Sequence, residues 1–169
     1  MNVEELDLQE LCEFLIEAKR ETFAKDGPRV SSKSQLSKNY LYERGDFRYE
    51  DQYFGEFLDV GEEIVWFRGV PVWGMGYRGG MLEGYENLAS RTFTLLKKAL
   101  MIPEPAFPIR GPRTLVEGEF EYKNTPIGNL TSFTGSEEIE LNGEPIYFRN
   151  YIGGLIFGKY NKEMKIKRE

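Results

Sequence analysis

The sequence predicts an α+β fold: two tandem helix-plus-antiparallel-strands repeats, related by a pseudo-twofold axis, form one antiparallel sheet packed against two helices. Three observations support this prediction. Helix-periodic stretches alternate with strand-rich ones, glycines and prolines recur in the same order in both halves, and hairpin signals separate the strands. The 169 residues suit a single domain over 1–169, with repeat one at about 3–82, repeat two at about 86–157 and a basic tail at 158–169.

The first repeat begins with a predicted helix over residues 3–24. Steps of three and four separate its apolar positions, the pattern of one buried face, at Leu8, Leu11, Cys12, Leu15, Ala18 and Thr22. Gly27 and Pro28 end this helix, and residues 29–39, rich in serine and lysine, are typical of an exposed loop. Cys12 is the single cysteine and lies on the apolar side, so we expect it in the core.

A strand-rich region follows over residues 40–77. Its aromatic and β-branched residues, separated by glycines, predict three or four short antiparallel strands. Arg68-Gly69 between two apolar runs predicts a two-residue hairpin turn. The second repeat has the same order, with a helix over 86–101 that cannot continue through the following prolines and further strands over 114–157.

An internal repeat is indicated by residues that match at an offset of 74. The matched pairs are Gly61 and Gly135, Gly69 and Gly143, Pro71 and Pro145, Tyr77 and Tyr151, Gly79 and Gly153, and Gly80 and Gly154. Sliding by one further residue also pairs Glu62-Glu63 with Glu137-Glu138. One continuous sheet covered by both helices would bury the apolar face of each half. The alternative is a curved half-barrel sheet around one helix, with glycines as bend points.

Composition and charge exclude several classes of function. The net charge of −6 gives no general attraction to nucleic acid or to anionic membranes, so we expect neither as a partner. The absence of histidine excludes Ser-His-Asp and Cys-His nucleophile systems and histidine zinc sites. No signal peptide, membrane span or cofactor motif is recognisable, so we expect a cytoplasmic location and no cofactor.

The segment Tyr42–Gly55 (YERGDFRYEDQYFG) resembles a prokaryotic domain family of unknown function. Further stretches that resemble this family are Phe14–Lys19, Ser31–Lys33, Gly61–Glu63 with Trp66, Pro71–Met75 and Arg110–Pro112. The sequence departs from the family pattern at Gln52, where threonine is expected, and at Gly76, where asparagine is expected. In this family the domain sometimes follows a helix-turn-helix regulator. The resemblance therefore implies a role in sensing or regulation through this association with DNA-binding domains, and it implies no particular enzymatic activity.

The candidate ligand-binding residues are aromatic side chains with polar tips, together with one arginine. Core packing and cross-strand pairing are the simpler explanation of these rings, and a concave ligand pocket or a partner surface is the alternative. The candidates are Tyr49, Tyr53, Trp66, Trp73, Tyr77, Tyr122, Tyr147, Tyr151 and Arg110.

Carboxylates form a second set of candidates. Two carboxylates at a suitable separation serve as acid and base on a glycosidic bond or hold a divalent cation. Adjacent residues of a strand face opposite sides, so we expect one member of each Glu-Glu pair to point to solvent. The candidates are Glu43, Asp46, Glu50, Asp51, Glu62, Glu63, Glu137 and Glu138.

Three hypotheses remain open for the function. The favoured one is a non-enzymatic module that binds a small molecule or a protein partner, because histidine is absent and aromatics are abundant. The second is a structural protein that forms a homodimer. The third is a carboxylate-based hydrolase or a metal-dependent enzyme, which requires at least two of the candidate acids to converge with raised proton affinity.

Overall fold

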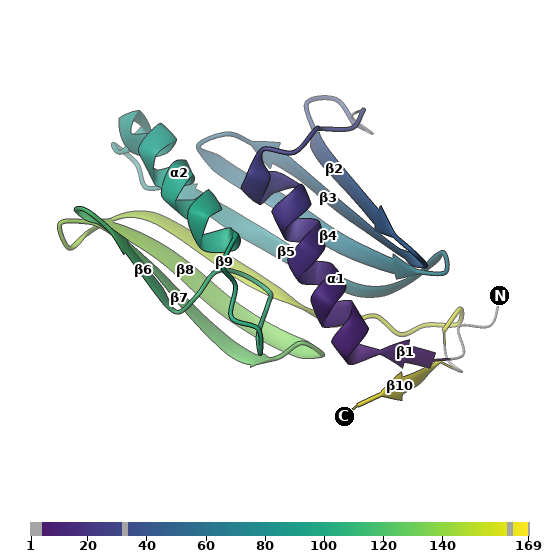
Figure 1. The fold of residues 1–169 in the computed structure, drawn as a ribbon. Helices are drawn as coiled ribbons and strands as arrows, with labels where there is room; N and C mark the ends of the chain where they lie inside the picture. Colours follow the sequence, from purple (N-terminus) through teal and green to yellow (C-terminus); the bar gives the residue numbers. More distant parts are fainter. Residues whose placement is uncertain (1–4, 32–33, 162–163, 169) are drawn as a thin grey trace.

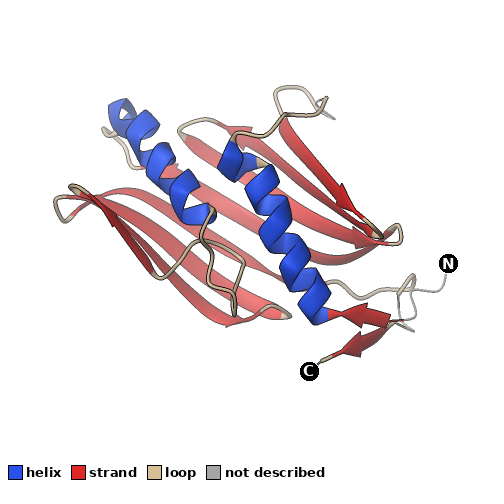
Figure 2. Cartoon of the chain, in the orientation of Figure 1, coloured by secondary structure: helices blue, strands red, loops and turns tan. Residues whose placement is uncertain are grey.

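The computed structural model describes residues 5–31, 34–161 and 164–168. Within these ranges the chain forms an eight-stranded antiparallel sheet, a separate pair of short strands, and two α-helices, α1 (Leu8–Glu21) and α2 (Ala89–Leu100). Both helices lie across the same face of the large sheet (Figure 1, Figure 2). The fold is therefore a mixed α+β arrangement with one sheet and two helices, and the half-barrel around one helix is not observed.

The two halves of the chain lie side by side in the sheet, and each contributes four neighbouring strands. The strand order is β2-β3-β4-β5-β9-β8-β7-β6, and β5 pairs with β9 at the centre. The strands are β2 (Lys38–Arg44), β3 (Phe47–Gly55), β4 (Leu58–Phe67), β5 (Val70–Met81), β6 (Thr114–Glu117), β7 (Phe120–Asn129), β8 (Ser132–Leu141) and β9 (Glu144–Leu155). Each neighbouring pair is antiparallel, so short turns connect the strands within each half.

The helices are shorter than their apolar patterns predict. Asp7 caps α1, since its carboxylate accepts hydrogen bonds from the backbone N–H groups of Gln9 and Glu10. Asp7 is also the last residue of strand β1 (Glu5–Asp7), and Phe23–Lys25 form a 3₁₀ turn, η1, in place of a last α-helical turn. The 3₁₀ turn η2 (Glu86–Leu88) likewise precedes α2.

Turn chemistry accounts for the hairpins. Arg68 and Gly69 have φ angles of 51° and 78°, so the expected two-residue turn joins β4 and β5. Asn142 and Gly143 have φ angles of 52° and 81° between β8 and β9. Asparagine and glycine tolerate these left-handed conformations better than other residues.

The structure adds a strand within the basic tail and corrects the expected burial of Cys12. Part of the basic tail is a strand, β10 (Lys165–Lys167), which pairs in parallel with β1, and Lys167 forms an ion pair with Asp7 at 2.9 Å. Cys12 is half-buried rather than a core residue, and its thiol lies 3.5 Å from the carbonyl oxygen of Pro105. Desolvation raises the pKa of this thiol.

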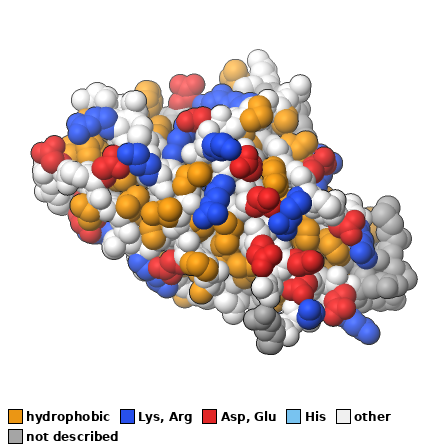
Figure 3. All heavy atoms as spheres, in the orientation of Figure 1, with side chains coloured by type: hydrophobic (Ala, Val, Ile, Leu, Met, Phe, Trp, Pro, Cys, Tyr) orange, Lys and Arg blue, Asp and Glu red, His pale blue; other side chains and the backbone are white. Residues whose placement is uncertain are grey.

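Apolar side chains of the helices and of the inner sheet face form two clusters. One joins α1 to β3, β4 and β5, with Leu11, Phe14 and Trp73 fully buried. The other joins α2 to the strands of the second half. Over the outer surface on the helix side, acidic and basic side chains are interspersed with apolar ones (Figure 3). No described helix combines the length and the apolar character that crossing a membrane requires.

Candidate functional site

A cluster of buried charges lies between the two helices and the inner face of the sheet. This charged cluster consists of Lys19 on α1, Asp51 on β3, Asp59 and Glu63 on β4, Arg110 in the loop after α2, Glu137 on β8 and Arg149 on β9. All except the half-buried Asp59 are at most 5% exposed. Charged side chains are almost never this buried unless they are paired, so their arrangement needs a specific explanation.

Strand periodicity brings carboxylates of neighbouring strands to the inner face. Asp51 stands directly opposite Glu63 in the pairing of β3 with β4. Glu137 stands opposite Arg149 in the pairing of β8 with β9. Because like charges directly opposite each other repel, Asp51 and Glu63 require nearby cations.

Cations from outside the sheet provide part of this compensation. The Lys19 ammonium of α1 donates a hydrogen bond to Glu63. Arg110 donates from Nη2 to Glu137 at 2.8 Å, and its Nη1 lies 3.9 Å from a Glu63 oxygen. Tyr122 donates its hydroxyl proton to the other oxygen of Glu137. Arg110 therefore bridges glutamates from the two halves of the sheet.

Arg149 and Asp59 form a third ion pair, across the central strands. Both terminal nitrogens of Arg149 donate to Asp59 at 2.8 Å, and its Nε donates to the Tyr147 hydroxyl at 2.7 Å. The guanidinium carbon lies 4.8 Å from the centroid of the Tyr77 ring. Gly79 of β5 stands opposite Asp59 of β4 on one side and opposite Arg149 of β9 on the other. The ion pair of Asp59 with Arg149 therefore crosses β5 at a residue that has no side chain.

Replacing Gly79 by alanine will destabilise the protein by about 1–3 kcal/mol, the usual cost of overpacking. An added Cβ would lie 2.2 Å from the Phe148 carbonyl oxygen and 2.8 Å from Arg149 Cβ, so backbone must shift. Gly76→Ala on the same strand is the matched control, because no atom lies within 4 Å of its added Cβ. Urea denaturation measures both variants, and equal stability would contradict this account of Gly79.

The environment shifts the pKa values of Asp51 and Glu137 in opposite directions. Burial, together with the charge of Glu63, raises the pKa of Asp51 to about 7, although Tyr77 donates a hydrogen bond to it at 2.6 Å. Burial also acts to raise the pKa of Glu137, but Arg110 and Arg149 outweigh it and hold that pKa below its usual value. Burial lowers the pKa of Lys19, against the opposing charge of Glu63.

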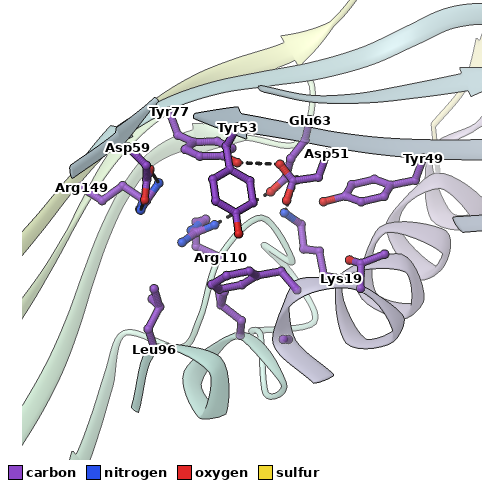
Figure 4. A pocket seen from close by; sticks show the side chains of 14 residues that line it. Lys19, Tyr49, Asp51, Tyr53, Asp59, Glu63, Tyr77, Leu96, Arg110 and Arg149 are labelled. Carbon is purple, nitrogen blue, oxygen red and sulfur yellow. Dashed lines mark hydrogen bonds and ion pairs between the residues drawn. The ribbon is translucent and has the colours of Figure 1, made fainter. Parts of the chain in front are cut away.

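A cavity of about 40 Å³ adjoins the charged cluster. Its lining comes from the end of α1 and η1, from Leu96 and Leu100 of α2, and from Tyr53, Asp51 and Tyr77 of the sheet. Figure 4 shows the Arg149–Asp59 pair on one side of Tyr53 and the Lys19, Asp51 and Glu63 group on the other. A cavity of this volume holds roughly three waters. It is smaller than the ~300 Å³ at which drug-sized pockets begin.

The structure distributes the aromatic candidates over several environments. Tyr49, Tyr53, Tyr77 and Arg110 line the cavity, whereas Tyr122 and Tyr147 contact the charged cluster from the second half. Tyr151 donates to the Asn124 side chain at 2.8 Å. Trp73 is buried, with its indole N–H on the Leu130 carbonyl, and Trp66 lies outside the cavity under Arg48.

Among the acidic candidates, only some face inward. Glu63 and Glu137 are buried, whereas Glu62 is exposed and Glu138 half-buried. Glu43, Asp46 and Glu50 form ion pairs with arginines away from the cavity. Among the described residues, no group of three or more Asp, Glu, Cys or His side chains is placed to hold a metal ion.

Three members of the charged cluster were not among the candidates drawn from the sequence: Lys19, Asp59 and Arg149. Lys19 carries a usable signal, because it lies four residues after Leu15 and next to Ala18, within the apolar stripe of the helix. Asp59 and Arg149 carry no comparable signal, since their pairing depends on the contact of β5 with β9.

A family model described as a domain of unknown function matches residues 51–156. The matched region starts at Asp51 and contains the whole charged cluster except Lys19. A search of curated proteins finds no significant match.

Proposed function

Because the chain belongs to the DUF5680 family, whose function is unknown, we propose its function from the geometry of the charged cluster. It is a non-enzymatic module that binds a small molecule in the cavity between α1, α2 and the sheet. The observation that supports this proposal best is that buried charged side chains line the cavity beside apolar and aromatic ones.

Energetics support a binding role for the cluster. Apolar residues of similar volume usually replace a buried ion pair without loss of stability, so stability alone does not call for these charges. Perturbed ionisable groups beside a cavity are typical of functional sites, and Asp51 and Lys19 both have shifted pKa values there. Tyr53 and Tyr77 add rings with polar tips to the same lining.

We also propose that the two halves arose by duplication and that the cavity belongs mainly to the first. Positive φ angles recur in both halves, at Gly45 and Gly118, Gly55 and Gly128, Arg68 and Asn142, Gly69 and Gly143, and Gly80 and Gly154. Tyr77 donates to Asp51 as Tyr151 donates to Asn124. The inward-facing Glu63 and Glu137 are 74 positions apart, the same offset as the matched glycines. The offset of 75, which pairs Glu62-Glu63 with Glu137-Glu138, does not match the two inward-facing glutamates.

A ligand screen with a blocked cavity tests the binding function. Thermal unfolding of the full chain is followed with small amines, carboxylates and alcohols. A ligand at one hundred times its Kd adds about 2.7 kcal/mol of stability, which raises Tm by about 5–10 °C for a chain of this size. Ala24→Leu places a larger side chain into the cavity lining and should abolish the shift.

Lys25→Leu is the matched control, because Lys25 is the exposed neighbour of Ala24 and does not line the cavity. It should keep the full ligand shift. A compound that stabilises Ala24→Leu as much as the unmodified protein binds elsewhere, and this result contradicts the proposal. So does a screen in which no compound raises Tm.

A further inference from the structure

We propose that the cavity binds a small organic ammonium group, which forms an ion pair with the Asp51 carboxylate. This inference rests on the proposed function and specifies its ligand class. It follows from the charges of the cluster, from the position of Asp51 at the cavity and from a second polar group that has no partner.

The charges of the cluster do not balance. Among the described residues it contains the cations Lys19, Arg110 and Arg149 and four carboxylates. Each cation has a nearest acid: Lys19 pairs with Glu63, Arg110 with Glu137 and Arg149 with Asp59. Longer contacts join Arg110 to Glu63 at 3.9 Å and Arg149 to Glu137 at 3.8 Å, and none of these ion pairs includes Asp51. Asp51 is the carboxylate left over, so the ionised cluster lacks one positive charge.

Among the described residues, no cation forms an ion pair with Asp51. The groups that face it are Lys19 from α1, Glu63 from β4, Tyr77 from β5, Arg110 from the loop after α2, and Tyr49 and Tyr53 on its own strand. Lys19 is hydrogen-bonded to Glu63, and Tyr77 donates the hydrogen bond that Asp51 accepts. Without a further cation, burial and the charge of Glu63 raise the pKa of Asp51 to about 7, so this carboxyl keeps its proton at pH values below that.

The second half of the chain shows that the tyrosine contact does not require a carboxylate. There, Tyr151 donates to the neutral amide of Asn124, whose own N–H group donates to the Gly111 carbonyl at 2.9 Å. An asparagine at position 51 would accept from Tyr77 in the same way. The negative charge of Asp51 therefore serves something other than this hydrogen bond.

Arg110 provides the independent observation. It is 5% exposed and lines the cavity, and its Nε–H has no hydrogen-bond acceptor in the described part of the chain. A buried donor without an acceptor costs about 1–3 kcal/mol. A ligand oxygen would satisfy it, so we expect the preferred amine to carry a hydroxyl group as well.

Two sets of matched probes test the ligand class by calorimetric titration of the full chain. The first set is ethanolamine, ethylene glycol and glycolate, and the second is ethylamine, ethanol and acetate. The amines should bind, their uncharged and anionic counterparts should not, and ethanolamine should bind more tightly than ethylamine. Amine affinity should rise about tenfold between pH 6 and pH 8, as Asp51 becomes ionised.

Asp51→Asn should weaken amine binding at pH 8 at least about tenfold and remove the pH dependence, because its amide stays neutral. Glu62→Gln, an exposed acid on the neighbouring strand, is the control and should bind as the unmodified protein does. The pH profile of the unmodified protein tests the idea even if Asp51→Asn does not fold.

The outcomes separate this inference from the proposed function. If glycolate or ethylene glycol binds the cavity as tightly as ethanolamine, the binding function stands and the ammonium class is wrong. Amine binding that is independent of pH, or unchanged in Asp51→Asn, also overturns the inference. If no probe and no compound of the wider screen binds, both proposals fail.

Discussion

Replacing Arg110 by methionine will lower the free energy of unfolding by about 3–5 kcal/mol, the usual cost of removing one partner from a buried ion pair. Arg110 is 5% exposed and holds Glu137 at 2.8 Å, with Glu63 at 3.9 Å. Methionine fills much of the same volume but leaves both glutamates without this cation. Urea denaturation at pH 7 measures the loss.

Arg113→Met is the matched control, because Arg113 is a largely exposed arginine whose Nε lies 3.5 Å from Glu104. An exposed pair of this kind contributes at most about 1 kcal/mol. The double variant Arg110→Met, Glu137→Gln should recover part of the loss, since it also removes the unpaired charge. If Arg110→Met costs no more than Arg113→Met, the bridging role of Arg110 is wrong.

Asp51→Asn will make the protein more stable at pH 8, and this gain will vanish as the pH falls to 4. In the folded state the pKa of Asp51 is raised from 3.8 to about 7. Between these values the folded state holds a proton that the unfolded chain has lost, so stability falls as the pH rises. Over this window the fall amounts to about 4 kcal/mol, at about 1.4 kcal/mol for each pH unit.

Chemical denaturation of both proteins between pH 4 and pH 8 measures this difference. Glu137 has a lowered pKa, so its contribution to stability is lost as the pH falls. Both proteins contain Glu137, and the difference between them isolates Asp51. Glu62→Gln should show no comparable trend, since Glu62 is exposed. A stability difference that does not change with pH would contradict the charge imbalance at Asp51.

Most of the fold was predictable from local patterns. The apolar stripes of 3–24 and 86–101 contain α1 and α2, and the stretches 40–77 and 114–157 contain most of β2 to β9. The expected exposed loop over 29–39 was too long, because β2 begins at Lys38 and Asn39 is buried, and β5 continues to Met81. The helix boundaries were too wide, because the apolar pattern continues through residues that form β1 and the 3₁₀ turns. Periodicity alone does not distinguish a 3₁₀ turn from the first or last turn of an α-helix.

The candidate site was predictable only in part. Tyr49, Tyr77 and Arg110 line the cavity, and Asp51 was a candidate acid. The ion pair of Arg149 with Asp59 joins residues 90 positions apart. No local pattern indicates such a contact, because it forms only when β5 and β9 pair at the centre of the sheet.

By itself, the sequence determined the elements of this protein, since helical period, strand composition and turn residues act over a few positions. Tertiary structure decided which acids are buried. A strand alternates its faces at every residue, so pairing sets whether Glu62 or Glu63 points inward. It also decided that Asp51 has no ion-pair partner in the described part of the chain, because Lys19, 44 positions from Glu63, reaches that glutamate instead. Such long-range electrostatic compensation exists only in the folded chain.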